Sequence, residues 1–262
     1  MDATETRFVR LGRDGGSVTI ELINSKTLNI IGSGAIDELT RAFGTVSRDG
    51  DVRVVVLRGA GEGAFIGGAD INEMATLDRS SAEVFIRRLA GLCEAIRDCP
   101  VPVIARLAGW CLGGGLEVAM SCDLRVAESG AKFGMPEVAV GIPSVIHSAL
   151  MPALIGASHA AWLLLTGETI DAGTAATWGL VHEVVAADAL DARIAQLGAR
   201  LGGFGPQAVR QQKRLLNSWF DMTVHGAIED SIEQFALAFL TGEPQQHMRA
   251  FLTRKKGEPT RE

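Results

Sequence analysis

Apolar positions in the first half of the chain change repeatedly between strand-like and helix-like spacing. Short β-rich runs at residues 7–11 and 17–22 flank a glycine-containing turn at 12–16, which predicts an opening hairpin. Helical spacing over residues 35–46 is followed by a nearly continuous apolar run at 53–57, which predicts a buried strand. This alternation predicts crossover connections and a mostly parallel sheet with helices packed against it.

Strand, glycine turn and helix then follow one another twice. The buried strand leads through glycine-rich residues 59–70 into a predicted helix at 71–75, with Asp70 in the capping position. A strand at 101–107 leads through glycines 113–115 into the helix that carries Glu117. Because the first N–H groups of a helix have no partner within it, each turn can direct backbone donors at a ligand.

Helical spacing dominates the rest of the chain, interrupted by strand patterns at 121–127 and 179–185. The composition changes near residue 200, which predicts a core domain over residues 1–200 and a helical region over 201–262. One predicted amphipathic helix, at residues 81–95, lies between the two glycine turns. The other predicted helices cover residues 149–154, 157–166, 171–177, 187–201, 207–218, 221–240 and 243–255.

Composition limits the classes of partner. Apolar residues make up 47% of the 262 residues, enough for a sizeable core. A net charge of −6 with both signs scattered along the chain argues against nucleic acid as the main partner. No apolar run reaches the ~20 residues of a membrane span, and the first residues are acidic and polar, so we expect no membrane association and a cytoplasmic location.

The cysteines do not indicate a metal centre. The 4 cysteines, Cys93, Cys99, Cys111 and Cys122, lie in apolar or helical contexts without metal-ligand spacing. We expect buried free thiols, no disulfide framework and no metal site.

The glycine turns fit an oxyanion hole better than a nucleotide site. Neither turn has the Lys-Ser/Thr of a P-loop or the G-x-G-x-x-G dinucleotide pattern. Two backbone donors aimed at a carbonyl oxygen stabilise its developing charge, by ~3 to 4 kcal/mol per donor. Glu117 lies among apolar neighbours, which predicts a raised pKa suited to proton transfer, and Glu137 follows in a loop bounded by apolar residues. For either glutamate alone, a salt-bridged or surface carboxylate is the alternative.

Nucleophilic catalysis is a weaker interpretation. Ser144, Ser148, His147 and Asp123 contain the residue types of a triad, but the chain has no G-x-S-x-G elbow. His147 remains a candidate to line a pocket, with a hydrogen-bonded histidine near a helix start as the alternative. Cys111 is better explained as a small buried hydrophobic residue.

Three blocks carry a family resemblance. In order and spacing, the segments 64–71, 112–123 and 131–137, followed by 165–168 and 178–181, resemble the crotonase, or enoyl-CoA hydratase/isomerase, superfamily. The resemblance covers residues 6 to 256, is closest to enoyl-CoA hydratase, and depends mainly on the first three blocks.

The resemblance implies an α/β fold, a crotonase-like spiral of repeated ββα units. It also implies that the C-terminal helical region mediates trimerisation and covers the active site, giving a homotrimer or a dimer of trimers. The implied substrate is an acyl-CoA thioester, so that coenzyme A is part of the substrate and no separate cofactor is needed.

By position in the blocks, Ala69 and Gly114 match the oxyanion hole, and Glu117 and Glu137 match the catalytic glutamates. The implied activity is that of an enoyl-CoA hydratase, which adds water to a trans-2-enoyl-CoA to give a 3-hydroxyacyl-CoA. Double-bond isomerisation, another crotonase-type lyase or hydrolase reaction, and a non-catalytic binding protein remain alternatives. The implied substrate-binding residues are Gly67, Gly68, Asp70, Ile71, Trp110, Leu112, Gly113, Pro136, Gly141 and His147.

Overall fold

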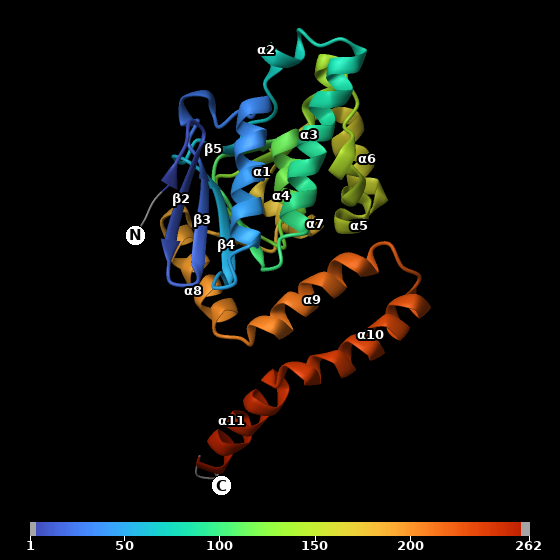
Figure 1. Cartoon of the computed structure of the whole chain (residues 1–262). Helices are drawn as coiled ribbons and strands as arrows, with labels where there is room; N and C mark the ends of the chain where they lie inside the picture. The colour runs from blue at the N-terminus through green and yellow to red at the C-terminus, as the bar shows by residue number, and fades with distance from the viewer. Residues whose placement is uncertain (1–3, 258–262) are drawn as a thin grey trace.

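Two sheets form the centre of the molecule (Figure 1). The computed structural model describes residues 4–257, with side chains described for 6–24 and 26–253. The larger sheet has the strand order β1-β2-β3-β4-β6-β8-β11, with bounds Thr4–Glu5, Val9–Asp14, Ser17–Leu22, Val54–Gly59, Val103–Leu107, Leu124–Glu128 and Glu183–Val185. The smaller sheet has the order β10-β9-β7-β5, with bounds Thr169–Asp171, Lys132–Gly134, Trp110–Leu112 and Ala64–Ile66.

The chain moves from one sheet to the other in repeated units. Strands β4, β6 and β8 lie parallel in the large sheet, and the strand after each of them, β5, β7 and β9, lies parallel to its equivalents in the small sheet. A helical segment follows each pair. This repetition of two strands and a helical segment confirms the expected crotonase-like α/β fold.

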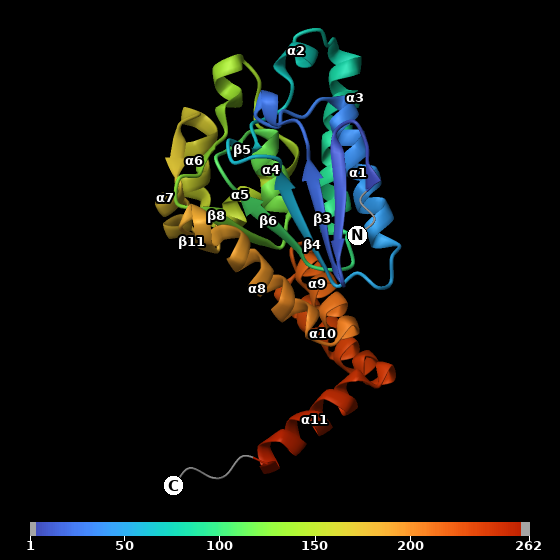
Figure 2. The same cartoon turned by 90° about the vertical axis from the view of Figure 1, so that its left-hand side faces the viewer.

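Helices cover both faces of the large sheet (Figure 2). Helices α1, α3 and α4 pack on one face, and α8 packs on the other through Leu190 and Ile194. The α-helices α1 to α11 span Ser33–Ser47, Ile71–Met74, Arg79–Arg97, Gly114–Ser121, Met151–Ile155, Ala157–Thr166, Ala172–Trp178, Leu190–Gly202, Pro206–Trp219, Val224–Ala238 and Glu243–Gly257. The 3₁₀ helices η1 to η5 span Ser25–Thr27, Pro136–Val140, Ile146–Leu150, Ala187–Ala189 and Phe239–Thr241.

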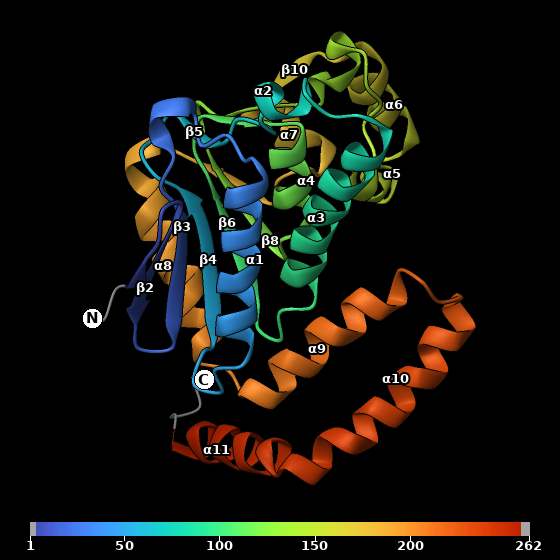
Figure 3. The same cartoon turned by 45° about the horizontal axis from the view of Figure 1, so that its top comes forward.

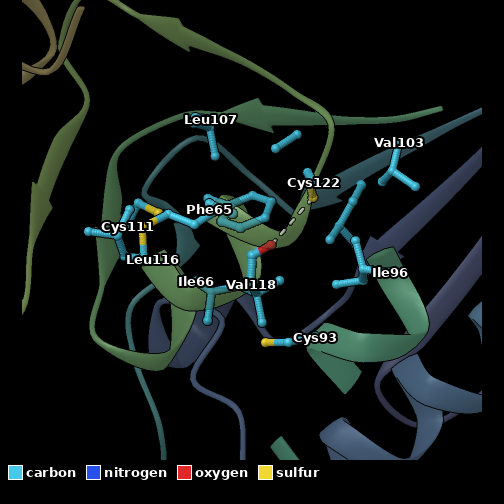
Figure 4. Packing of buried hydrophobic residues seen from close by; sticks show 14 of the residues in the cluster. Phe65, Ile66, Cys93, Ile96, Val103, Leu107, Cys111, Leu116, Val118 and Cys122 are labelled. Atoms are coloured by element: carbon cyan, nitrogen blue, oxygen red, sulfur yellow. Dashed lines mark hydrogen bonds between the residues drawn. The ribbon is translucent and has the colours of Figure 1, made fainter. Parts of the chain in front are cut away.

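Helix α4 lies at the centre of the core, and each of its residues is buried. Its Leu116 and Val118 lie among buried side chains from neighbouring elements, including Phe65 and Cys111 (Figure 4). Such complete burial favours apolar side chains, so a carboxylate on this helix needs a functional explanation.

The cysteines are as predicted. Cys93, Cys99, Cys111 and Cys122, all within the described part of the chain, are buried free thiols. Cys122 donates a weak hydrogen bond from Sγ to the Val118 carbonyl oxygen at 3.4 Å (Figure 4).

Several element boundaries differ from those predicted. The opening strands continue to Asp14 and Ser17, which pair with each other, so the turn is shorter than residues 12–16. The strand expected at 121–127 begins at Leu124, because α4 continues to Ser121. Strands β5, β7 and β9 were not predicted from the residue pattern, since three residues are too few to show a period of two. The expected cap is confirmed: Asp70 accepts hydrogen bonds from the N–H groups of Asn72 and Glu73.

The last three α-helices extend away from the sheets (Figures 1 and 3). Helix α9 is joined to the core through Lys213, which is 5% exposed. Its Nζ lies 2.7 Å from Asp123 Oδ2 and donates to the carbonyl oxygens of Ile96 and Val101 at 3.1 Å each. Within residues 4–257, none of the helices combines the length and the hydrophobicity needed to span a bilayer.

Candidate active site

A cavity of about 340 Å³ lies where the two glycine turns meet. Its wall combines backbone from both turns, apolar side chains from α2 and α3, and the segment from η2 towards η3. The lining residues are Gly67, Gly68, Ala69, Ile71, Met74, Phe85, Ile86, Leu89, Leu112, Gly113, Gly114, Glu117, Pro136, Glu137, Ala139, Val140, Ile142, Pro143, Ser144 and Val145. All the lining residues thus come from the core, and none of the described residues of α9 to α11 is among them.

The first turn is held by the segment before α1. The Gly67 N–H donates to the Leu28 carbonyl, the Ile31 N–H to the Gly68 carbonyl, and the Asp70 N–H to the Ile31 carbonyl. These bonds fix the backbone on both sides of Ala69. The Ala69 N–H itself donates to none of the described residues, so it is available to a ligand.

A buried asparagine supports the same turn, and sequence reasoning missed it. Asn29 is fully buried, and its Nδ2 donates to the carbonyl oxygens of Ala60 and Ala64 at 3.0 and 2.7 Å. Its Oδ1 accepts from the Asn24 N–H. The only signal in the sequence was an amide side chain among apolar neighbours, which is also common in ordinary turns.

The second turn brings backbone close to the second glutamate. Gly113 precedes α4 with φ of 53°, a backbone conformation that favours glycine. A Cβ atom at this position would lie 2.6 Å from Glu137 Oε1. The backbone conformation therefore favours glycine, and a side chain here would also displace the Glu137 carboxylate.

The two candidate oxyanion amides lie near each other. A Cβ atom placed on Gly114 would be 4.0 Å from the Cβ of Ala69, and both residues line the cavity. Gly114 is the first residue of α4, and its N–H, like that of Ala69, has no acceptor in the part of the chain that the structure describes. Both amides are therefore available to a ligand in this cavity.

Glu117 is 3% exposed and points into this cavity from α4. Its Oε1 accepts two hydrogen bonds from Ser148, at 3.0 Å from the N–H and 2.7 Å from the hydroxyl. Burial raises the pKa of Glu117 to about 7; the Ser148 donors oppose this effect and the nearby charge of Glu137 adds to it. The predicted increase is confirmed, and the carboxyl group can exchange a proton near neutral pH.

Glu137 is the second residue of η2 and is half-buried. Its Oε2 accepts a hydrogen bond from the Ser144 hydroxyl at 2.9 Å. Burial raises the pKa of Glu137, and its own backbone and the Ser144 hydroxyl oppose the increase. The structure therefore brings both predicted carboxylates to one cavity, each with a serine donor.

Six of the predicted substrate-binding residues line the cavity: Gly67, Gly68, Ile71, Leu112, Gly113 and Pro136. The other four, Asp70, Trp110, Gly141 and His147, do not. Asp70 caps α2, and Gly141 ends η2 in the left-handed conformation.

His147 and Trp110 are oriented elsewhere. His147 is half-buried outside the cavity, and its Nδ1 has no partner among the described residues. Burial and the charge of Arg97, at the end of α3, lower its pKa. Trp110 lies on β7 with a partly exposed ring.

The residues of the hypothetical triad do not assemble. Ser148 donates to Glu117, Ser144 donates to Glu137, and Asp123 pairs with Lys213 at the far end of the sheet. Across the described residues, no cluster of three or more His, Cys, Asp and Glu side chains is placed to hold a metal ion.

The family follows from comparison with known proteins. The family model described as enoyl-CoA hydratase/isomerase matches residues 13–259. The chain belongs to the enoyl-CoA hydratase/isomerase family. Among curated relatives of this family, the short-chain-enoyl-CoA hydratase of Clostridium acetobutylicum is 32% identical over 97% of this chain and 98% of that protein. The crotonyl-CoA hydratase of Syntrophomonas wolfei is 34% identical over 88% of this chain and 89% of that protein.

Solved structures agree. The crystal structure of enoyl-CoA hydratase from Mycobacterium smegmatis has a TM-score of 0.92 and 30% identity, and covers 95% of this chain and 97% of that one. Both the resemblance to enoyl-CoA hydratases and the crotonase fold are therefore confirmed. The roles of the individual site residues remain predictions.

Proposed function

We propose that this member of the enoyl-CoA hydratase/isomerase family adds water to a short trans-2-enoyl-CoA and gives the 3-hydroxyacyl-CoA. The observation that carries the proposal is that Glu117, Glu137 and the free amides of Ala69 and Gly114 all line one cavity. The names of the two curated relatives support a short acyl chain.

In this proposal the thioester carbonyl oxygen accepts hydrogen bonds from the Ala69 and Gly114 amides. When water adds to the β-carbon, negative charge moves through the α-carbon to that oxygen as the enolate forms. Donors already fixed at this position stabilise the charge without reorganising, by about 3 kcal/mol for each donor in comparable sites. The fixed backbone around Ala69 and the start of α4 provide this preorganisation.

The two carboxyl groups handle the protons. One carboxylate takes a proton from the attacking water as its oxygen bonds to the β-carbon, and the other, protonated, gives a proton to the α-carbon. The net result is the addition of one water across the double bond, and the pair contains as many protons after the reaction as before it. Burial raises the pKa of Glu117 to about 7 and also raises that of Glu137, so Glu117 can exchange a proton with the substrate near neutral pH.

The remaining parts of the proposal concern the environment of the enzyme. Coenzyme A enters as part of the substrate, and the scheme calls for no resident cofactor or metal. We also propose a homotrimer or dimer of trimers in the cytoplasm. Support for an oligomer comes from the apolar side chains that α9 to α11 expose, among them Ile228, Ile232 and Phe235.

A product assay tests the reaction. Purified protein is incubated with crotonyl-CoA, and the loss of enoyl-thioester absorbance is followed together with the product mass. Hydration is expected to add the mass of water, and heavy-oxygen water is expected to place its label on the product. A product of unchanged mass would instead indicate isomerisation, and binding of several enoyl-CoA thioesters without turnover would contradict an enzymatic role.

A further inference from the structure

The segment between η2 and η3 contacts both candidate catalytic carboxylates. Ser144 lies just before η3 and Ser148 lies within it, and each donates a hydroxyl hydrogen bond to a different glutamate, Ser144 to Glu137 and Ser148 to Glu117. The second contact is reinforced by the Ser148 N–H. A hydroxyl bonded to a carboxylate fixes the rotation of that side chain as well as its charge distribution.

Each contact engages only one oxygen of its carboxylate. Ser148 holds Glu117 Oε1, and Oε2 accepts no hydrogen bond from the described residues. Ser144 holds Glu137 Oε2, and Oε1 lies beside Gly113 in the cavity wall. The oxygen that remains without a protein donor is therefore available to water or to the substrate in both cases.

The backbone of the segment is specialised for this arrangement. Ile146, between the two serines, has φ of 40°, which is unusual for a β-branched residue. Its side chain packs against the hydrophobic core. The Ser148 N–H bonds both the Val145 carbonyl and Glu117 Oε1. An unfavourable backbone conformation persists only when its surroundings fix it, and such conformations concentrate at functional sites.

We propose that Ser144 and Ser148 are positioning residues that hold the two glutamates so that one oxygen of each faces the reacting carbons. This inference depends on the proposed hydration reaction. The two serines would act together, because the Ile146 turn sets the distance between them. Neither serine is the nucleophile of the reaction.

The charged environment of the pair gives a second readout. The ionisable groups that face Glu117 are Glu137, from η2, and the thiol of Cys93, from α3. The Ser148 donors lower the pKa of Glu117, and the Ser144 hydroxyl lowers that of Glu137. Removing either hydroxyl should therefore raise the pKa of the glutamate it contacts and move the corresponding limb of the pH profile to higher pH.

The test compares kcat, KM and pH profiles for crotonyl-CoA hydration by the wild type, Ser148→Ala, Ser144→Ala and Ser148→Thr. Loss of a hydrogen bond to a charged group is expected to lower kcat by about 10- to 100-fold in Ser148→Ala, with KM nearly unchanged. Ser148→Thr keeps the hydroxyl and should recover most of the rate. Ser144→Ala should give a smaller loss, because Glu137 is only half-buried.

Ser121→Ala is the matched control. Ser121 is as buried as Ser148, at 4% exposure, but its hydroxyl donates to the main-chain oxygen of Glu117 at 2.8 Å and not to the carboxylate. Its kcat and pH limbs should remain those of the wild type. If Ser148→Ala does not fold, Ser144→Ala and Ser148→Thr still decide the question.

The outcomes separate the two proposals. A wild type that does not hydrate any enoyl-CoA overturns the proposed function. An active wild type, with both alanine variants matching Ser121→Ala in kcat and in the positions of the pH limbs, overturns the positioning role and leaves the proposed function intact.

Discussion

Helices α4 and α10 both carry many apolar residues, yet they lie in opposite environments. Each residue of α4 is buried, whereas α10 has no buried residue. On α4 the exceptional residue is therefore the charged one, Glu117, and its burial raises its pKa. On α10 the exceptional residues are apolar, with Ile228, Ile232 and Phe235 more than half exposed. The buried Glu117 carboxylate, which faces a cavity, therefore indicates chemistry, and the exposed apolar stripe of α10 indicates a partner.

The largest expected effect is on the buried side of this comparison. Glu117→Gln and Glu137→Gln remove the proton-transfer groups while keeping shape, so each should lower kcat for crotonyl-CoA by about 10²- to 10⁴-fold. The measurement is steady-state loss of enoyl absorbance. Glu94→Gln, on the exposed side of α3, serves as the control and should retain the wild-type rate. Full activity in both cavity variants would contradict the assigned roles.

The next largest effect is expected on stability, at the ion pair that joins α9 to the core. Lys213→Met leaves the Asp123 carboxylate without its ammonium partner at the junction of α9 with the core. Breaking such a buried pair should lower the free energy of unfolding by about 3 kcal/mol. Denaturant titration measures the loss, and kcat of the folded fraction should be unchanged because Lys213 lies outside the cavity. An unaltered midpoint would show that α9 does not depend on this contact.

The third prediction concerns the pH dependence of stability. Because the pKa of Glu117 is raised from 4.5 to about 7 in the folded protein, the folded state binds this proton more tightly than the unfolded chain. The stabilisation is complete below about pH 4.5 and is lost as pH rises to about 7, a change of about 3 kcal/mol. Denaturant titrations across this range should show a steeper decline for the wild type than for Glu117→Gln. Parallel curves would contradict the raised pKa.

The smallest effect on catalysis is expected on the exposed side. Ile232→Glu combined with Phe235→Glu places charges on the apolar stripe of α10 and should dissociate the proposed oligomer, as measured by light scattering across a concentration series. Since no described residue of α10 lines the cavity, kcat should change little. A variant that keeps the wild-type mass would place the interface elsewhere. A strong loss of kcat would instead support the prediction that this region covers the site, in that case from another copy, because none of its described residues lines the cavity of its own chain.

Sequence reasoning located the parts of this molecule that depend on local pattern. A short stretch of sequence is enough to recognise the glycine turns, the apolar neighbours of Glu117 and the long helices. The short strands β5, β7 and β9 cannot be recognised in this way, because three residues are too few to show the alternation of apolar and polar positions that is typical of a strand. Their existence followed only from the family resemblance.

The contacts of single side chains were harder to predict. By residue type Ser144 and Ser148 are candidate nucleophiles, and no local feature of the sequence shows that their hydroxyl groups donate to the two glutamates. Asn29 and His147 illustrate the same limit: the first supports the site from a distant segment, and the second was expected in the cavity but lies outside it. These side-chain positions depend on how segments distant in the sequence pack together. The residue types next to each side chain do not show that packing.

The most direct test of the central claim is a crystal structure with a bound acyl-CoA that resembles the substrate but does not react. The account predicts that the thioester oxygen lies within about 3.2 Å of both the Ala69 and the Gly114 amide nitrogens, with the α- and β-carbons facing the Glu117 and Glu137 carboxylates. A thioester oxygen bonded to neither amide, or an acyl chain bound away from both glutamates, would contradict it.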